Sequence, residues 1–180
     1  EIDYVINCAF PRENNCEILS QGIDYSNKLF NLIKKYDMNN IINISSQSVY
    51  KQPSRFGMIN ESGEIGPRDA YGVAKFACEI LFEEIFKGSR SHTNVRLASV
   101  NFKERFTQKF VKMCLENKQI TILSREQKVS LIDVRDAALG VLSLMDLPSF
   151  EWRKHYNLGT GRTINMAEIA KIVVEVGEKD

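Results

Sequence analysis

Residues 41–50 read Ile-Ile-Asn-Ile-Ser-Ser-Gln-Ser-Val-Tyr, and residues 71–75 read Tyr-Gly-Val-Ala-Lys. The run 41–44 is short, largely apolar and β-branched, which is typical of a buried strand. A cluster of hydroxyl side chains follows it, where we expect the strand to end. Residues 70–87 carry apolar side chains at helical spacing, so Tyr71 and Lys75 fall one turn apart on one helix face. This order of strand, polar turn and helix decides the fold that we expect.

The rest of the chain continues the same alternation of strands and helices. Extended segments are predicted over 2–9, 41–44, 94–100, 120–123, 129–132 and 155–158. Helices are predicted over 17–36, 70–87, 106–117, 134–145 and 164–176. This alternation favours an α/β fold with a mostly parallel sheet. The long loop predicted over 45–69 follows a strand, and loops of this length are usually functional or mobile.

Length and composition exclude several classes of protein. The chain has 180 residues, which at about 150 per domain predicts one unit with a small annex. A net charge of +1 supplies no sequence-wide field that would attract nucleic acid or anionic lipid. Since no apolar run reaches about 18 residues, we expect no membrane span. Four scattered cysteines and two histidines predict no metal site, reduced and mostly buried thiols, and a cytoplasmic location.

The chemistry indicated by these residues is proton transfer. A lysine ammonium close to a phenol favours the phenolate and brings tyrosine toward general acid–base work. A serine hydroxyl nearby could hold a substrate oxygen against it. The alternative for each element is structural, because Y-x-x-x-K occurs by chance and a serine pair after a strand often serves the turn. Both elements in this order, with correct flanking patterns, favour catalysis.

Six segments of the chain resemble, in order, motifs of one family. The family is the extended short-chain dehydrogenase/reductases, in particular the NAD-dependent epimerase/dehydratase group, which acts largely on nucleotide-sugars. The six segments are residues 3–9, 45–50, 71–75, 95–97, 131–138 and 156–161. In the same order, they resemble the family motifs D-x-V-I-H-x-A, S-S-x-x-V-Y, Y-G-x-S-K, x-L-R, F-I-H-V-D-D-V-A and Y-N-L-G-x-G. Glu79 falls where a Glu commonly follows the third motif. The resemblance implies a Rossmann-like, doubly wound parallel sheet.

The resemblance also implies residue roles. Tyr71 would exchange a proton with a sugar hydroxyl while a hydride passes between the adjacent carbon and the nicotinamide of NAD or NADP. Lys75 would hold the nicotinamide ribose, and Ser46 would orient the reacting oxygen. The catalytic residues implied are therefore Ser46, Tyr71 and Lys75. The cofactor-binding residues implied are Asn7, Cys8, Ala9, Ser45, Tyr71 and Lys75.

By the same resemblance, residues 1–100 are the remainder of an NAD(P)-binding Rossmann domain. Residues 101–180 are mainly a small substrate-binding α/β part, with some elements returning to the first domain. The family's G-x-x-G-x-x-G turn, which holds the pyrophosphate at a helix N-terminus, is not in these residues. We therefore expect that the N-terminal βαβ part is missing, that NAD binding is lost or weak in this chain, and that the chain alone is inactive. Gly22 stands where the family often carries Asn.

A nucleotide-sugar is the small-molecule substrate that we expect. The alternatives are a reductase of a non-sugar carbonyl, and a non-catalytic relative that binds a nucleotide or a protein. Val129 or Ser130 stands where many members carry an arginine that clamps the diphosphate. Arg125, Lys128 and Arg135 either replace it or are solvated surface charges. A homodimer that pairs through the helix after Ser46 and the Tyr71 helix is expected by analogy.

Overall fold

The computed structural model describes residues 2–51, 59–88, 91–101, 106–122 and 128–177. The chain divides into two units. The first unit comprises Glu1–Leu97 and Leu139–Leu158, and the second comprises Ala98–Ala138 and Gly159–Asp180. Each unit is discontinuous in sequence, so the chain leaves the first unit after Leu97 and returns to it at Leu139.

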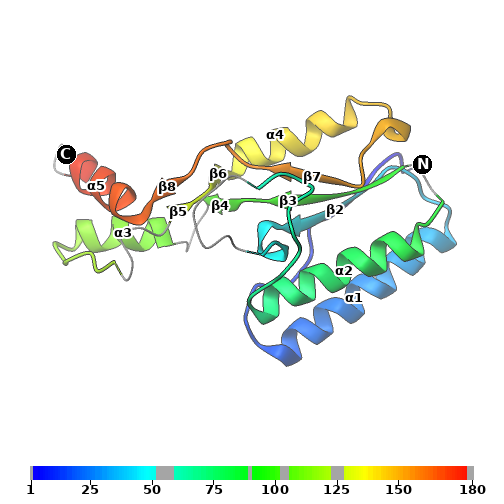
Figure 1. Cartoon of the computed structure of the whole chain (residues 1–180), viewed down its shortest axis with the longest axis horizontal. Helices are drawn as coiled ribbons and strands as arrows, with labels where there is room; N and C mark the ends of the chain where they lie inside the picture. Colours follow the sequence, from blue (N-terminus) through cyan, green and yellow to red (C-terminus); the bar gives the residue numbers. More distant parts are fainter. Residues whose placement is uncertain (1, 52–58, 89–90, 102–105, 123–127, 178–180) are drawn as a thin grey trace. The chain divides into compact units, whose positions relative to one another are not determined.

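The first unit is built on one parallel sheet of four strands, in the order β1-β2-β3-β7 (Figure 1). The strands are β1 (Val5–Asn7), β2 (Ile41–Ser46), β3 (His92–Leu97) and β7 (His155–Leu158). The helices of this unit are α1 (Cys16–Lys35), α2 (Ala70–Ile85), most of α4 (Val134–Met145), and the short η1 (Gln47–Val49) and η2 (Ser149–Glu151). The parallel sheet confirms the predicted Rossmann-like α/β fold.

Helices cover both faces of this sheet, with α1 and α2 side by side on one face and α4 on the other (Figure 1). Successive side chains of a strand point to opposite faces. Ile41 accordingly packs with Phe30 and Phe82 of α1 and α2. The neighbouring Ile42 packs with Val141 of α4 and with Trp152. The first unit therefore has one apolar cluster on each face of its sheet.

Side-chain caps fix the starts of the two helices that lie side by side. Asn15 Oδ1 accepts hydrogen bonds from the backbone N–H groups of Glu17 and Ile18, at 3.0 and 3.2 Å. Asp69 Oδ1 accepts one from Gly72 N–H at 2.7 Å. Such caps satisfy amide groups that have no partner within the helix. The cap at Asp69 places Tyr71 in the first turn of α2.

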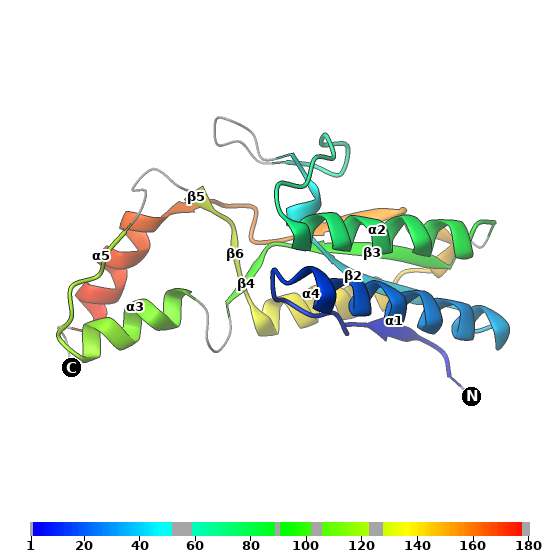
Figure 2. The ribbon, with the colours of Figure 1, turned by 90° about the horizontal axis from the view of Figure 1, so that it is seen from below.

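The second unit has its own strands, helices and core. Its strands are β4 (Ser99–Asn101), β5 (Lys128–Val129), β6 (Leu131–Asp133) and β8 (Ile164–Asn165), and its helices are α3 (Phe106–Leu115) and α5 (Met166–Gly177). β4 and β6 pair in parallel, and β5 and β8 pair antiparallel. α3 and α5 lie side by side (Figure 2), and Phe110 of α3 packs with Ile169 and Ala170 of α5.

Two predicted strands are wrong. The single strand expected over 94–100 is divided at Ala98, because β3 belongs to the four-stranded sheet and β4 pairs with β6 in the other unit. The strand expected over 120–123 is not formed by its described residues, 120–122. Ile120 and Ile122 instead pack against the cluster around Phe110. The alternating apolar side chains that suggested a strand therefore pack against the helices α3 and α5.

The exposure of the cysteines contradicts one prediction from the sequence. All four are free, but Cys8 and Cys16 are exposed and only Cys78 is buried, so the prediction of mostly buried thiols is wrong.

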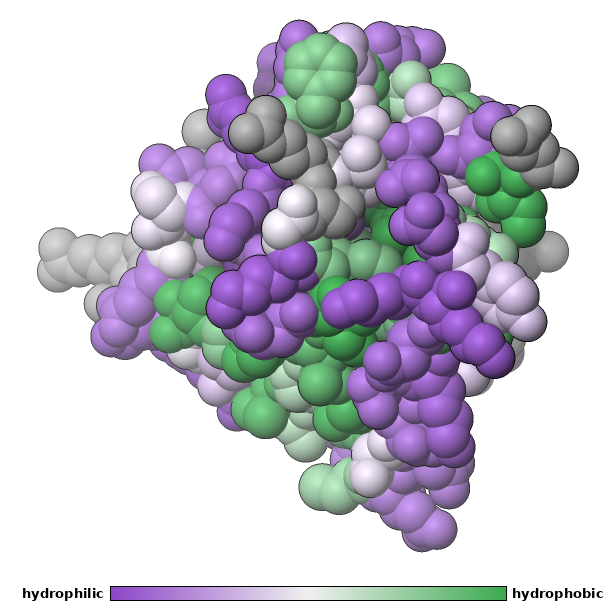
Figure 3. Space-filling view, turned by 90° about the vertical axis from the view of Figure 1, so that its right-hand side faces the viewer, coloured by the Kyte–Doolittle hydropathy of each residue, from purple (hydrophilic) through white to green (hydrophobic). Residues whose placement is uncertain are grey.

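Large apolar side chains also reach the surface, and Figure 3 shows them among hydrophilic residues on one side of the molecule. Within the described residues, no helix is both long and apolar enough to cross a bilayer.

A buried ion pair joins α2 to the centre of the sheet. Arg96 of β3 donates to the Glu79 carboxylate of α2 at 2.7 and 3.0 Å, and both side chains are only 2% exposed. A further guanidinium N–H donates to the Tyr50 hydroxyl at 2.8 Å, and that hydroxyl donates to Asn157 Oδ1 at 2.8 Å. The pair is satisfied within the protein, and it fixes the rotation of α2 over the sheet.

Substitution of Arg96 by Met should destabilise the protein by about 3–5 kcal/mol, because it leaves the Glu79 carboxylate buried without its partner. The free energy of unfolding is measured by urea denaturation. Lys28→Met is the matched control, because Lys28 pairs with Asp24 at 2.6 Å on the exposed surface, where such pairs contribute about 0–1 kcal/mol. Equal effects of the two substitutions would contradict the central role of Arg96.

Candidate functional site

The carboxyl end of β2 and the first turn of α2 meet closely. Ser46, the last residue of β2, caps η1 and accepts a hydrogen bond from Ser48 N–H at 3.2 Å. On α2, a side chain at position 72 would collide with the Ser48 carbonyl oxygen. Gly72 is therefore required for this close approach, and it lies next to Tyr71 in sequence. The structure thus brings the elements that carry Ser46 and Tyr71 against one another.

Lys75 extends from α2 toward the same strand end. It is 4% exposed, and its ammonium donates a hydrogen bond to the Ile44 carbonyl oxygen at 2.6 Å. Burial lowers the pKa of Lys75 from 10.5 to about 8, although the nearby Cys78 and Glu79 oppose the shift. The ammonium can therefore release or take up a proton not far above neutral pH.

Phe10 contacts both Tyr71 and Lys75. The rings of Phe10 and Tyr71 meet edge to face, with their centroids 6.1 Å apart and an interplanar angle of 66°. The Lys75 ammonium lies 4.4 Å from the centroid of the Phe10 ring, in a cation–π arrangement. The backbone N–H of Tyr71 also donates to Asn14 Oδ1 at 3.1 Å, so the segment between β1 and α1 contacts the first turn of α2 at two points.

A row of polar side chains crosses the sheet beneath α1 and α2. Asn7, Asn43, Asn94 and His155 are in register on four neighbouring strands. Asn7 donates to Asn43 at 3.0 Å, Asn43 to Asn94 at 2.7 Å, and Asn94 to Glu83 at 3.1 Å. Burial lowers the pKa of His155 at the end of the row. These bonds satisfy buried amides, which would otherwise destabilise the fold.

The residues expected to bind a cofactor lie in different surroundings. The Asn7 side chain is held by the polar row, and its oxygen accepts a hydrogen bond from Ala9 N–H at 3.2 Å. Cys8 and Ala9 are exposed at the end of β1. Ser45 is 4% exposed, and among the described residues its hydroxyl has no hydrogen-bond partner. A buried hydroxyl without a partner is available to a ligand.

Several residues of this region were not predicted from the sequence. Phe10 was assigned no role, although it directly follows the segment 3–9. The polar row had a detectable signal, because Asn7, Asn43 and Asn94 each interrupt an apolar strand. A buried asparagine needs hydrogen-bond partners. Asparagines that recur in several buried strands therefore indicate a hydrogen-bond network across the strands.

Arg125, Lys128 and Arg135 are the candidate phosphate contacts, and the structure describes only Lys128 and Arg135. Arg125 lies outside the described residues, and Lys128 is exposed. Arg135 pairs with Asp133 at 2.9 Å and is 86% exposed, as expected of a solvated surface charge. In the part of the chain that the structure describes, no three metal-ligating side chains come together.

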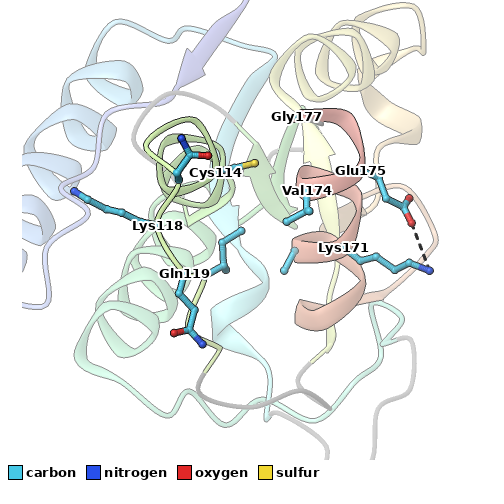
Figure 4. Close-up of a pocket in the computed structure, with 10 residues that line it drawn as sticks. Cys114, Lys118, Gln119, Lys171, Val174, Glu175 and Gly177 are labelled. Atoms are coloured by element: carbon cyan, nitrogen blue, oxygen red, sulfur yellow. Dashed lines mark ion pairs between the residues drawn. The ribbon is translucent and has the colours of Figure 1, made fainter. Parts of the chain in front are cut away.

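A pocket of about 640 Å³ lies between α3 and α5 (Figure 4). Its lining mixes apolar and charged side chains, including Cys114, Val174 and the ion pair of Lys171 with Glu175 at 3.5 Å. None of the predicted catalytic residues lines it. It is therefore separate from the candidate site on α2 and β2.

The parallel sheet with helices on both faces defines a Rossmann-like α/β protein. Serine, tyrosine and lysine lie on adjoining elements at a strand end and form a candidate proton-transfer site. The family model described as "NAD dependent epimerase/dehydratase family" matches residues 1–159. The chain belongs to this family. The resemblance read from the six segments is thereby confirmed.

Solved structures of similar fold include three enzymes that act on nucleotide-sugars. UDP-glucuronic acid 4-epimerase of Bacillus cereus, solved with NAD, has a TM-score of 0.88 and 20% identity, and the match covers 100% of this chain and 61% of that one. UDP-glucose 4-epimerase of Thermotoga maritima, solved with UDP-glucose, has a TM-score of 0.85 and 20% identity, with 99% and 62% covered. An NAD-dependent NDP-hexosamine 5,6-dehydratase of tunicamycin biosynthesis has a TM-score of 0.85 and 16% identity, with 99% and 61% covered.

This chain therefore spans about three fifths of the length of these structures. At identities of 16–20%, the likeness shows the fold. A search of curated protein sequences found no match.

The buried Lys75 should give a distinct pH dependence of stability. Its pKa is about 8 in the folded protein and close to 10.5 when the chain is unfolded, so between these values the unfolded chain binds more protons. The free energy of unfolding should therefore rise with pH across this window, by about 3 kcal/mol in total.

The measurement is urea denaturation from pH 7 to 11, comparing the native Lys75 with Lys75→Met. Both proteins carry Cys8→Ala and Cys78→Ala, because thiols of ordinary pKa 9.0 titrate in the same range. A stability difference between the two that does not change with pH would show that folding does not lower the pKa of Lys75.

Proposed function

We propose that the protein is an NAD(P)-dependent enzyme that acts on a nucleotide-sugar, by proton and hydride transfer at a sugar carbinol. The observation that carries this proposal is the buried Lys75 ammonium, one helical turn from Tyr71 and bonded to the strand end that leads to Ser46. Perturbed, buried charges of this kind are concentrated at active sites. Family membership supports the same reaction class.

Each of the three side chains would have a separate task. The Tyr71 phenolate would take the proton from a sugar hydroxyl at Oη, and the phenol so formed would return it in the reverse step. The positive charge of Lys75 would stabilise the negative charge of the phenolate. The Ser46 hydroxyl would hold the reacting oxygen in place, since the turn of η1 that it caps is itself fixed by hydrogen bonds.

The surroundings of these residues fit a dinucleotide. Lys75 and the unpartnered Ser45 hydroxyl are the groups of this chain that would hold its ribose and nicotinamide end, and the exposed residues Cys8 and Ala9 would line it. When bound, NAD would supply the acceptor and donor of the hydride. NADP is the alternative. Because residues 1–180 hold no G-x-x-G-x-x-G turn, we expect weak binding by this chain alone, and assays use the whole protein.

Epimerase and dehydratase chemistry are both compatible with this site, and a reductase of a non-sugar carbonyl or a non-catalytic relative is the alternative. A nucleotide-sugar is favoured because the similar solved structures are enzymes of such substrates. The first unit would then bind the cofactor, and the second would contribute mainly to substrate binding. Four free cysteines support a cytoplasmic location.

We also propose that the protein forms a homodimer through α1 and α2. Tyr25 and Leu32 of α1 are exposed although apolar, as are Val73 and Ile80 of α2. Each pair is separated by seven residues, which places its members on one helix face. Exposed apolar stripes on two neighbouring helices are typical of an interface between proteins.

Tyr71→Phe should lower turnover by about 10²- to 10⁴-fold, because it removes the proton-transferring hydroxyl and leaves the ring in place. Turnover is measured with NAD and with UDP-glucose, UDP-glucuronic acid and UDP-N-acetylglucosamine in turn, and NAD affinity is measured by calorimetry. Tyr36→Phe, at an exposed position at the end of α1, is the control, and it should retain full turnover. If Tyr71→Phe turns over like the native enzyme, the proposed mechanism is wrong.

Ile80→Glu should convert the dimer to a monomer, because it places a charge in the apolar interface. The molar mass in solution is measured by light scattering coupled to size-exclusion chromatography. Leu139→Glu makes the same change at an exposed position of α4 and should leave the dimer intact. A native protein that is already monomeric, or a dimer that only Leu139→Glu dissociates, would refute this interface.

A further inference from the structure

The ring of Phe10 covers the Lys75 ammonium. The distance from Nζ to the ring centroid is 4.4 Å. An oxygen that accepts a hydrogen bond from an ammonium lies about 2.8 Å from it. Between Nζ and the ring, such an oxygen would come within roughly 2 Å of the centroid, whereas nonbonded atoms need about 3.5 Å. No hydroxyl group can therefore reach Lys75 from this side while the ring stays in place.

The other contacts of Lys75 leave little room for approach. The ammonium donates to the Ile44 carbonyl oxygen at 2.6 Å, and the residue as a whole is 4% exposed. Cys8, Cys78 and Glu79 are the charged or titratable groups that interact with it. Ile44 lies within the parallel sheet and pairs with Val95 of β3, which fixes its backbone. Phe10, in contrast, is half-buried and lies between β1 and α1, outside any helix or strand.

Gly22 of α1 provides the space in which Phe10 and Pro11 lie. A Cβ atom at position 22 would come within 2.6 Å of Pro11 Cδ and 3.0 Å of Phe10 Cε2. Real Cβ atoms do not make contacts as short as the first, so any side chain there would displace these residues. A small residue at position 22 and a large one at position 10 thus form a complementary pair beside the candidate site.

We propose that Phe10, seated against Gly22, is a gate over Lys75, and that its ring must swing away before the ribose hydroxyls of a dinucleotide can bind the ammonium. This inference rests on the proposed function for the identity of the ligand, but not for the gate itself. A side-chain rotation of Phe10 exchanges one contact of Lys75 for another, because the ring leaves as the hydroxyls arrive. Phe10 is thereby a positioning residue that controls access to the lysine.

The test is competitive labelling of the whole protein with acetic anhydride, without nucleotide. The rate constant of the neutral Lys75 amine is obtained by mass spectrometry from the pH profile of labelling. In Phe10→Ala this constant should rise roughly tenfold, since the ring contact that shields the amine is lost. Phe150→Ala, which removes an exposed ring elsewhere, is the control and should leave the constant unchanged.

An unchanged rate constant for Lys75 in a folded Phe10→Ala protein would overturn the gate. If that variant does not fold, Gly22→Ala provides the second test, because it displaces the ring and should also accelerate Lys75 labelling. NAD titration is a separate measurement. Faster labelling with no NAD binding by any form would support the gate and refute the proposed function, whereas NAD binding with unchanged labelling would do the reverse.

Discussion

The buried pair of Arg96 and Glu79 sets the position of the candidate site. Glu79 lies four residues beyond Lys75, which lies four beyond Tyr71, so the three share one face of α2. Anchoring Glu79 to β3 through two short hydrogen bonds fixes the rotation of the helix about its axis. The contact of Gly72 with η1 then fixes the N-terminal turn of α2. The geometry of the candidate site therefore depends on an ion pair in the core.

The face of the sheet beneath α1 and α2 changes in character along the strands. Ile41 and Phe82 form an apolar layer near the start of β2, the asparagine row through Asn43 follows, and Arg96 with Glu79 lies beyond it. Polarity therefore increases toward the carboxyl ends of the strands, where parallel α/β sheets bind ligands. The row also extends to the site, because its first member binds the backbone that leads to Phe10.

The sequence predicted those features that depend on neighbours in the chain. The helix over 134–145, the start of a helix at residue 70 and the placement of Tyr71 and Lys75 on one helix follow from local spacing. The break at Ala98 was missed because an apolar β-branched run looks the same whether it serves one sheet or two. The asparagine row and the Phe10–Gly22 contact were missed because their partners are 12 to 51 residues apart in sequence, and only the fold brings them together.

Two buried cations of this unit differ in how their charge is compensated. Arg96 has a carboxylate, a hydroxyl and an aromatic ring in contact, which is a complete set of partners for a guanidinium. Lys75 contacts one carbonyl oxygen and one ring, and neither carries a negative charge. A fold selected for stability alone would avoid such a lysine, because burying an incompletely compensated ammonium is costly. The dinucleotide of the proposed function would offset this cost, because its hydroxyls would supply the hydrogen bonds that Lys75 lacks.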